Sequence, residues 1–211
     1  MTEYHKIETI FERDMKGTKR LIEGKFRNTH VEYLKDNQWI FTEKIDGTNV
    51  RIIWDGHNVS FGGRTDNAQM PTPLIQTLNK MFLGITNEQL FEQQFGEKEV
   101  VLYGEGYGGK IQSGSAYTQE QTFILFDIKV QGKFLSREAV EGIAKSFNIP
   151  VVPICLTGTI KEAIDYVRTK PNSLIAEQTK ESEGVVGRPL VEFTDFRGNR
   201  IIVKIKVCDF C

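Results

Sequence analysis

Apolar and polar residues alternate with a period of two near the end of the chain. The apolar positions of residues 200–207 are Ile201, Val203, Ile205 and Val207, which interleave with Ile202, Lys204 and Lys206. This pattern predicts a half-buried strand whose apolar side faces a core. Two lysines on the other side repel each other, which a solvent-exposed edge tolerates, whereas a polyphosphate ligand would make the pair favourable. The strand alone favours the exposed edge, but Lys44 and Glu183 upstream reverse this preference in favour of the ligand.

A second region of alternation surrounds Lys44. The residues before it, 39–42, are strong β formers, and Asp46-Gly47 after it is a turn signal. Apolar residues then recur at every second position up to Trp54, where Asp55-Gly56 turns the chain back as in a β-hairpin. Lys44 is therefore predicted at the end of a strand, a position well placed for chemistry.

Helical spacing and capping residues predict several peripheral helices. Leu74, Leu78 and Phe82 fall on one helical face. The later predicted caps are Asn87 for a helix through Phe95, Ser136 for a helix through Phe147, and the capping box Thr159-x-x-Glu162. Near the N-terminus, Ile7, Ile10 and Phe11 also have helical spacing. The chain is expected to combine a strand-rich core with scattered helices.

Glycines surround Glu105, which ends a predicted strand beginning at Val100. The glycines are Gly104, Gly106, Gly108 and Gly109. A glycine-rich loop lets the backbone approach a phosphate or a sugar closely. A Rossmann motif would need a helix directly after the loop, and residues 111–115 do not supply one. The loop is expected to serve a nucleotide in another fold, or else to be a flexible connection without a ligand.

Residues 123–130 predict a further strand. Strict alternation places Ile124, Phe126, Ile128 and Val130 on one side, with Phe123, Leu125, Asp127 and Lys129 on the other. An aromatic residue in a strand is ordinarily a core residue. Phe126 is therefore a packing residue unless the surrounding motifs give it another role.

Composition indicates one soluble globular domain. The chain has 211 residues, of which 39% are hydrophobic and 26% charged. It contains no apolar run of transmembrane length and no signal peptide, so the expected compartment is the cytoplasm, with no membrane partner. Three cysteines fit a reducing compartment. The pair Cys208-x-x-Cys211 lacks the further ligands of a zinc site and is expected to be two ordinary thiols.

The net charge of −1 leaves nucleic-acid binding to a local basic surface. One candidate lies near the N-terminus and consists of Lys16, Lys19, Arg20, Lys25 and Arg27. These residues form either a solvated, irregular face or a surface that contacts nucleic acid.

Six short motifs follow one another in a fixed order. They are Lys44-x-Asp46-Gly47, Arg64, Tyr103-Gly104-Glu105-Gly106, Phe126-Asp127, Glu183-Gly184-Val185-Val186 and Lys204-x-Lys206. In this order they resemble the covalent nucleotidyltransferases, which are the polynucleotide ligases and mRNA capping enzymes. The likeness is strongest to the phage-type RNA ligases that seal nicks, and it spans roughly residues 5–207.

The resemblance implies a role for each motif. Lys44 resembles the adenylated nucleophile, and Glu183 the residue that supports a catalytic Mg²⁺ or Mn²⁺. The residues that resemble nucleotide-binding positions are Glu43 at adenine, Phe126 stacked on the base, Glu105 at the ribose hydroxyls, Asn49 and Arg64 at ribose, phosphate or the RNA end, Ile45, and Lys204 and Lys206 at the α-phosphate. Asp46 and Asp127 lie in the motifs without a defined role.

These residue types suit the chemistry that the resemblance implies. A lysine attacks phosphorus only as the neutral amine, so nearby positive charge from Lys204, Lys206 and a metal ion would help by lowering its pKa. The same charges would stabilise the equatorial oxygens of the α-phosphate during displacement of pyrophosphate. The implied reaction has three steps: self-adenylation from ATP, transfer of AMP to an RNA 5′-phosphate, and sealing by a 3′-hydroxyl.

The implied fold is an α+β, ATP-grasp-like nucleotidyltransferase domain of antiparallel sheets around a nucleotide cleft, with peripheral helices. It would occupy residues 1–211 as a single domain without an appended C-terminal domain, so a partner protein or a homodimer is expected to replace one. Asn49 stands where DNA ligases and capping enzymes carry arginine, which favours RNA and ATP. Two alternatives stay open: a GTP-dependent capping guanylyltransferase, and a non-catalytic nucleotide- or RNA-binding module.

Overall fold

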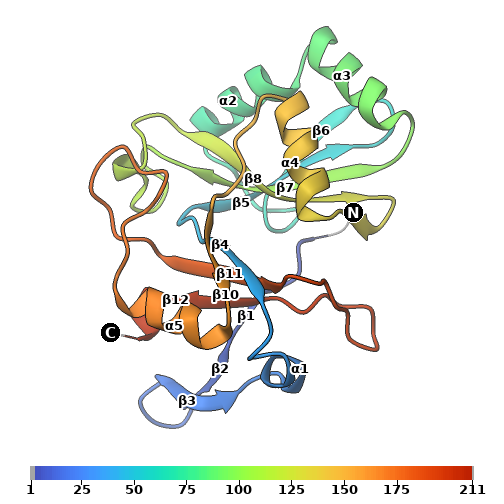
Figure 1. The fold of residues 1–211 in the computed structure, drawn as a ribbon. Coiled ribbons are helices and arrows are strands. Elements are labelled where there is room, and N and C mark those ends of the chain that lie inside the picture. Colours follow the sequence, from blue (N-terminus) through green and yellow to red (C-terminus); the bar gives the residue numbers. More distant parts are fainter. Residues whose placement is uncertain (1–2, 211) are drawn as a thin grey trace. The chain divides into compact units, whose positions relative to one another are not determined.

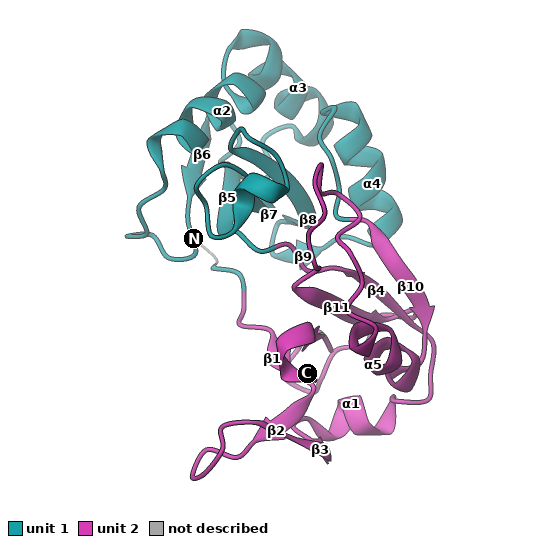
Figure 2. Ribbon diagram, turned by 90° about the vertical axis from the view of Figure 1, so that its left-hand side faces the viewer, with its two compact units in different colours: residues 1–4, 46–152 teal, residues 5–45, 153–211 magenta. Residues whose placement is uncertain are grey.

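The computed structural model describes residues 3–210 and contains two compact units. Among the described residues, unit 1 comprises 3–4 and 46–152, and unit 2 comprises 5–45 and 153–210. Figure 1 shows the ribbon and Figure 2 colours the two units. Each unit combines a mainly antiparallel sheet with a few helices, which confirms the predicted α+β class.

A five-stranded antiparallel sheet forms the centre of unit 1. Its spatial order is β6 (Val59–Gly62), β5 (Thr48–Trp54), β7 (Val100–Tyr107), β8 (Thr122–Val130) and β9 (Lys133–Phe134). β5 and β6 are joined through Asp55, whose carboxylate accepts the N–H groups of His57 and Asn58 at 2.8 and 2.7 Å. The predicted hairpin after the Asp46-Gly47 turn is confirmed.

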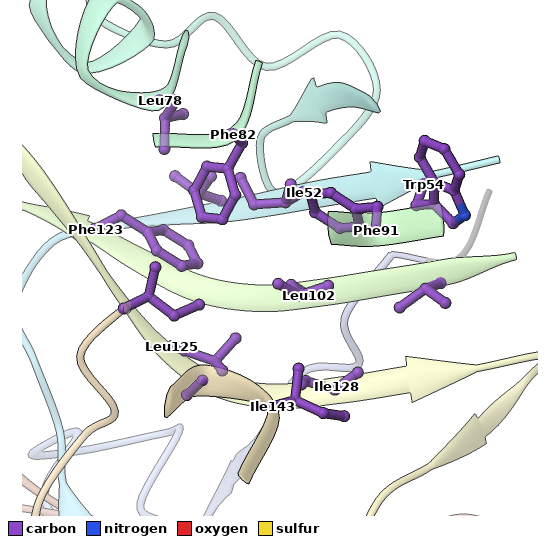
Figure 3. Close-up of a cluster of buried hydrophobic side chains, with 14 of the residues drawn as sticks. Ile52, Trp54, Leu78, Phe82, Phe91, Leu102, Phe123, Leu125, Ile128 and Ile143 are labelled. Carbon is purple, nitrogen blue, oxygen red and sulfur yellow. The ribbon is translucent and has the colours of Figure 1, made fainter. Parts of the chain in front are cut away.

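The helices of unit 1 cover one face of this sheet. They are α2 (Thr72–Phe82), α3 (Ile85–Phe95) and α4 (Arg137–Ser146), and a 3₁₀ turn, η1, spans Gly114–Ala116. In Figure 3, Phe82 of α2 points toward the sheet, and its ring meets that of Phe123 edge-on at 5.6 Å. Trp54 stacks on Phe91 at 5.5 Å. These aromatic side chains are almost completely buried and hold the helices against β5 and β8.

Two of the predicted caps have different outcomes. Ser136 accepts the N–H of Ala139 and caps α4, as predicted. Asn87 does not cap α3, because the helix begins at Ile85 after Gly84, whose φ of 96° suits a glycine. The Asn87 amide instead donates to the carbonyl of Leu83 at 2.9 Å. The prediction missed the start of α3 at Ile85 because, in the sequence alone, an asparagine inside the first turn cannot be told from an N-cap residue.

A β-bulge breaks the predicted alternation of β8. Tyr103 pairs with Asp127, but the next residue of β7, Gly104, pairs with Leu125, so Phe126 is the extra residue. Leu125 therefore shares the helix-covered core with Ile128, whereas Phe126 packs on the other face. The prediction of strict alternation over 123–130 is wrong at this residue.

A second five-stranded sheet forms the centre of unit 2. Its order is β1 (Glu8–Thr9), β12 (Val203–Lys206), β11 (Gly184–Pro189), β4 (Trp39–Glu43) and β10 (Ile154–Gly158), with β1 parallel to β12 and the other pairs antiparallel. α5 (Ile160–Arg168) packs on it and begins at Thr159 with the predicted capping box. A 3₁₀ turn, η2 (Val207–Asp209), follows β12.

The N-terminal segment of unit 2 is extended rather than helical. β2 (Phe11–Arg13) pairs with β3 (Leu21–Phe26), and only the short α1 (Thr29–Tyr33) follows. Phe11 and Phe26 meet edge-on at 5.0 Å at the base of this hairpin. The helical spacing of Ile7, Ile10 and Phe11 was therefore misleading, because three residues fit either period. Among residues 3–210, no helix is long and apolar enough to span a membrane.

Candidate active site

Three neighbouring strands of unit 2 bring four of the predicted site residues together. Lys44 directly follows β4, Glu183 directly precedes β11, and Lys204 and Lys206 lie on β12. Gly184 pairs with Lys206, and its carbonyl accepts the N–H of Lys44 at 2.9 Å. The position of Lys44 at a strand end confirms the prediction from sequence.

The Glu183 carboxylate joins two of the lysines. Lys44 Nζ donates to Oε2 at 2.5 Å, and Lys206 Nζ lies 2.6 Å from Oε1. Burial alone would raise the pKa of Glu183, but Lys44 and Lys206 outweigh it and hold this pKa below its ordinary value. Burial likewise lowers the pKa of Lys206, and Glu183 more than offsets this, so the pKa of Lys206 is raised. Both oxygens of the acid are therefore committed to ammonium groups.

Lys204 is the third cation of this group and has no ion pair among residues 3–210. Burial and then the positive charges of Lys44 and Lys206 lower its pKa. β12 is paired on both sides and the two lysines are half-buried, so the exposed edge that the strand alone favoured is wrong. Three ammonium groups around one carboxylate leave a net positive site that suits an anionic ligand.

Glu43, the last residue of β4, is a buried acid with 2% of its surface exposed. Its Oε2 accepts the N–H of Leu174 at 2.8 Å, while Oε1 has no hydrogen-bond partner among the described residues. Burial raises the pKa of this carboxyl. A buried oxygen that accepts no hydrogen bond lowers the stability of the folded protein, so a hydrogen-bond donor on a ligand would bind there favourably. Ile45, two residues on, is buried at 4% exposure.

In unit 1, Asn49 and Glu105 lie directly opposite each other on β5 and β7. Opposite residues of an antiparallel pair share a face, so these two predicted nucleotide-binding residues are neighbours. Asn49 Oδ1 is buried and has no hydrogen-bond partner among residues 3–210. Gly104 and Gly106 lie within β7 rather than in a loop, so the predicted glycine-rich loop is confined to Gly108 and Gly109.

Gly104 of β7 and Gly47 of the first motif are both needed for close packing. A Cβ on Gly104 would overlap the carbonyl of Ile124 and the ring of Phe123. At Gly47, in the turn before β5, a Cβ would overlap the Gly106 carbonyl and come within 2.8 Å of Glu105 Cγ. The turn of the first motif therefore packs against the Glu105 motif, and a side chain at Gly47 would push them apart.

Phe126 belongs to an aromatic cluster on the face of the sheet that helices do not cover. Tyr4 packs edge-on against Phe126 at 5.0 Å and against Tyr103 at 4.9 Å. The Tyr4 hydroxyl also donates to Oδ2 of Asp127, which is completely buried, at 2.8 Å. Asp127 thus has a structural contact within the cluster, and Tyr4 supports the motif that contains Phe126.

A family model described as RNA ligase matches residues 37–206, most of the chain. The chain belongs to the RNA ligase family. No curated protein matches it. The described chain has the nucleotidyltransferase fold of an RNA ligase. The motif residues described above lie inside the matched range, and the supporting residue Tyr4 lies before it.

Solved structures with a similar fold include several of Naegleria gruberi RNA ligase. A mutant with ATP and Mn has a TM-score of 0.67 and 18% identity, covering 98% of this chain and 56% of that chain. A mutant with AMP and Mn has a TM-score of 0.68 and 16% identity, with coverage of 98% and 56%. The structure with PPi has a TM-score of 0.62 and 19% identity, with coverage of 84% and 52%. The chain therefore spans about half the length of these relatives.

The described residues contain no cluster of three or more His, Cys, Asp or Glu side chains that could hold a metal ion. Glu183, the predicted metal residue, supplies a single carboxylate. This donor set fits Mg²⁺ or Mn²⁺ held jointly by one carboxylate and the phosphates of a substrate, rather than by a complete protein site. Either ion would have to compete with Lys44 and Lys206 for the oxygens of Glu183.

The basic N-terminal cluster divides into two groups. Lys25 and Arg27 form ion pairs of 2.6 Å with Glu12 and Glu8. The remaining three, Lys16, Lys19 and Arg20, lie in the exposed β2–β3 turn and form no ion pair within residues 3–210. Asp14 fixes this turn by accepting the N–H groups of Gly17 and Thr18 at 3.0 and 2.9 Å.

The other predicted positions lie apart from the Lys44–Glu183 group. Asp46 donates its N–H to the Tyr117 hydroxyl at 3.2 Å. Arg64 is exposed in the loop after β6. Cys155 is half-buried and Cys208 exposed, both as free thiols, whereas Cys211 lies outside the described residues.

Sequence reasoning missed three supporting residues: Tyr4, Leu174 and Arg51. Tyr4 carried no sequence signal, because the Asp127 carboxylate that it binds lies 123 residues away. Leu174 contributes only a backbone N–H, which no residue pattern reveals. Arg51 did carry a sequence signal, because a charged residue between the apolar Val50 and Ile52 of a central strand must be buried with a partner.

Proposed function

We propose that the protein is an ATP-dependent RNA ligase that joins RNA 3′-hydroxyl and 5′-phosphate ends through a lysyl-AMP intermediate on Lys44. The observation that carries the proposal is the group formed by Lys44, Glu183, Lys204 and Lys206 on three adjacent strands. A lysine nucleophile beside two further cations is the arrangement that attack on a nucleotide phosphate requires.

In the proposed first step, Lys44 Nζ attacks the α-phosphorus of ATP. A nitrogen–phosphorus bond forms, the bond to the β-phosphate oxygen breaks, and pyrophosphate leaves with the electron pair. The nitrogen must lose a proton, and we assign this proton to solvent water, because Glu183 is a weak base with a lowered pKa. We infer that Glu183 orients the amine, while Lys204 and Lys206 stabilise the oxygens of the α-phosphate.

The second and third proposed steps use the same anion-binding group. The 5′-phosphate of an RNA end attacks the α-phosphorus, the nitrogen–phosphorus bond breaks, and Lys44 recovers its amine. A 3′-hydroxyl then attacks the 5′-phosphorus of the activated end, releasing AMP. Both steps build negative charge on phosphate oxygens, which Lys204 and Lys206 would stabilise.

Four residues are proposed to recognise the nucleotide, namely Glu43, Phe126, Glu105 and Asn49. Glu43 has one buried oxygen without a partner among the described residues, and the amino group of adenine would supply the missing donor. Phe126 would stack on the base, and Glu105 and Asn49 would bind the ribose, where Asn49 also has an unmatched oxygen. Arg64 would contact the RNA end.

A divalent cation is proposed as part of the reaction, with Glu183 as its protein contact. When bound, Mg²⁺ or Mn²⁺ would neutralise charge on the phosphates of ATP. Two of the similar Naegleria structures contain ATP or AMP together with Mn, which supports the choice of nucleotide and metal.

The three unpaired cations of the β2–β3 turn are the proposed RNA-contacting surface. Lys16, Lys19 and Arg20 project from a turn that Asp14 holds in place, whereas the remaining two basic residues of the cluster are neutralised. Replacing all three by alanine should weaken binding to nicked RNA duplex and reduce the slope of log K against log salt by up to about 2.7, since each phosphate contact contributes roughly 0.9.

The proposal is tested by incubating the protein with ATP labelled at the α-phosphate and a divalent metal, followed by denaturing electrophoresis. A covalent adduct with ATP but not GTP, absent in Lys44→Ala, is expected. Sealing of nicked RNA in preference to nicked DNA should follow. Selective labelling by GTP would instead indicate a capping guanylyltransferase. If no nucleotide labels the protein, and added pyrophosphate releases no ATP from a pre-adenylated form, a non-catalytic binding module is indicated.

A further inference from the structure

Arg51 is a charged side chain inside the sheet of unit 1, with 1% of its surface exposed. It lies on β5 opposite Tyr103 of β7 and opposite Gly62 of β6. A Cβ on Gly62 would lie 2.8 Å from Arg51 Nη2 and 3.1 Å from Nε. The backbone at Gly62 therefore lies directly against the guanidinium, and a side chain there would displace it.

The Arg51 guanidinium binds the loop after β6 at two points. Its Nε donates to the carbonyl of Gly63 at 2.8 Å, and Nη2 donates to Oδ1 of Asp66 at 2.8 Å. These two acceptors lie on either side of Arg64 in the sequence. The loop also closes on itself, because the N–H of Ala68 donates to the carbonyl of Thr65 at 3.1 Å. Arg64 and Thr65 are thus exposed residues between two fixed points, and Arg64 is the charged one.

The cost of burying Arg51 is not matched by the strength of its ion pair. Asp66 is 58% exposed, and a carboxylate so open to water contributes little stability to a pair. Arg51 Nη1 is buried without a hydrogen-bond partner among the described residues, which is a further cost. An apolar residue at this strand position would stabilise the folded protein at least as well as the buried ion pair does. What the guanidinium uniquely provides is a planar fork that fixes two acceptors relative to each other.

We propose that Arg51 and Asp66 are positioning residues that hold the Gly63–Asp66 loop so that Arg64 is presented to the RNA end. This inference rests on the proposed ligase function and on the role assigned to Arg64. Neither Arg51 nor Asp66 touches the substrate. Displacement of a substrate-binding group by about 1 Å can cost up to about a hundredfold in rate, so loss of the fork should reduce sealing even in a well-folded protein.

The test uses Asp66→Ala, because the exposed Asp66 side chain can be removed without opening the core. Arg64→Ala is expected to lower the rate of nick sealing roughly 100-fold, and Asp66→Ala roughly 10-fold. If Asp66 acts through Arg64, the double variant should seal at the rate of Arg64→Ala alone, since the effects of residues acting as one unit are not additive. Asp66→Asn keeps an acceptor oxygen for Nη2 and should restore most of the activity. Arg51→Lys, which cannot bond both acceptors, should not.

The matched control is Glu141→Ala. Glu141 is also a half-exposed carboxylate paired at 2.6 Å with a largely buried arginine, Arg137, in the same unit, but its helix does not carry the Arg64 loop. This variant should seal at the wild-type rate. Hydrogen exchange supplies a readout independent of activity: amides of residues 63–68 should exchange faster in Asp66→Ala than in the control.

Failure of this inference differs from failure of the proposed function. If wild-type protein forms no adduct and seals no RNA, the ligase proposal fails and the inference with it. If wild type seals RNA while Asp66→Ala seals equally well, or if the Asp66 and Arg64 effects multiply in the double variant, the positioning role is overturned and the ligase function stands. If the Arg64→Ala variant seals nicked RNA at the wild-type rate, the positioning role is overturned as well.

Discussion

Replacing Glu183 by glutamine should destabilise the protein although the two side chains have the same size. The substitution removes the carboxylate that joins Lys44 to Lys206 and leaves these two lysines with Lys204 as three neighbouring cations. A neutral amide can still accept one hydrogen bond, but it cannot offset repulsion among ammonium groups. The effect should therefore come from charge rather than from packing.

The size of the effect follows from the geometry of the two contacts. A hydrogen bond to a charged group contributes about 1.5–3 kcal/mol when it is shielded from water. Here Glu183, Lys44 and Lys206 are 18%, 25% and 28% exposed, so solvent screens both contacts. Taking about 1 kcal/mol for each gives a loss of about 2 kcal/mol. For a chain of this length that corresponds to a fall in melting temperature of roughly 4–8 °C.

The assay is thermal unfolding followed by circular dichroism, without nucleotide or metal. Glu181→Gln is the matched control, because Glu181 is an exposed acid two residues away and should leave the melting temperature unchanged. Adding Lys206→Met to Glu183→Gln should recover part of the loss, since it removes one of the repelling charges. A Glu183→Gln protein that melts within about 1 °C of wild type would refute the reasoning, as that interval is below the effect of 1 kcal/mol.

Three further predictions concern single contacts. Tyr4→Phe removes the hydroxyl bonded to the buried Asp127 carboxylate and should lower the free energy of unfolding by about 1–3 kcal/mol in urea titration, while an unchanged midpoint would contradict this contact. Gly104→Ala should be more severe, because the added Cβ overlaps a carbonyl and a ring, and loss of soluble protein or a strongly lowered urea midpoint is expected. Burial raises the pKa of the Cys155 thiol to about 11, so its reactive thiolate is scarce below that pH. At pH 8, iodoacetamide should therefore label the exposed Cys208 well before Cys155, as measured by peptide mass spectrometry. Equal labelling rates would contradict this prediction.

The sequence was sufficient for features that depend on neighbours along the chain. The turn after β4 placed Lys44 at a strand end, and the period of two put Lys204 and Lys206 on one face of β12. The capping box at Thr159 and the β5–β6 hairpin were also predictable, because caps and tight turns are set by a few adjacent residues. The ordered motifs indicated the family, which the family model then confirmed.

Features that depend on strand pairing were not predictable from local pattern. Insertion of β11 between β4 and β12 joins Glu183 to Lys44 across 139 residues, and nothing in either segment specifies that neighbour. The bulge that turns Phe126 to the other face is likewise set by pairing with β7, because alternation within β8 gives no sign of it. For the same reason β12 taken alone resembled an exposed edge, and only the distant Lys44 and Glu183 motifs argued against this interpretation.

The most direct test of the account is to find which residue carries AMP. The protein would be incubated with ATP and Mg²⁺, digested under conditions that preserve the nitrogen–phosphorus bond, and mapped by tandem mass spectrometry. The account predicts one AMP on Lys44, with Lys204 and Lys206 unmodified. AMP on either of those two lysines, or no adduct in protein that still seals RNA, would contradict the central claim.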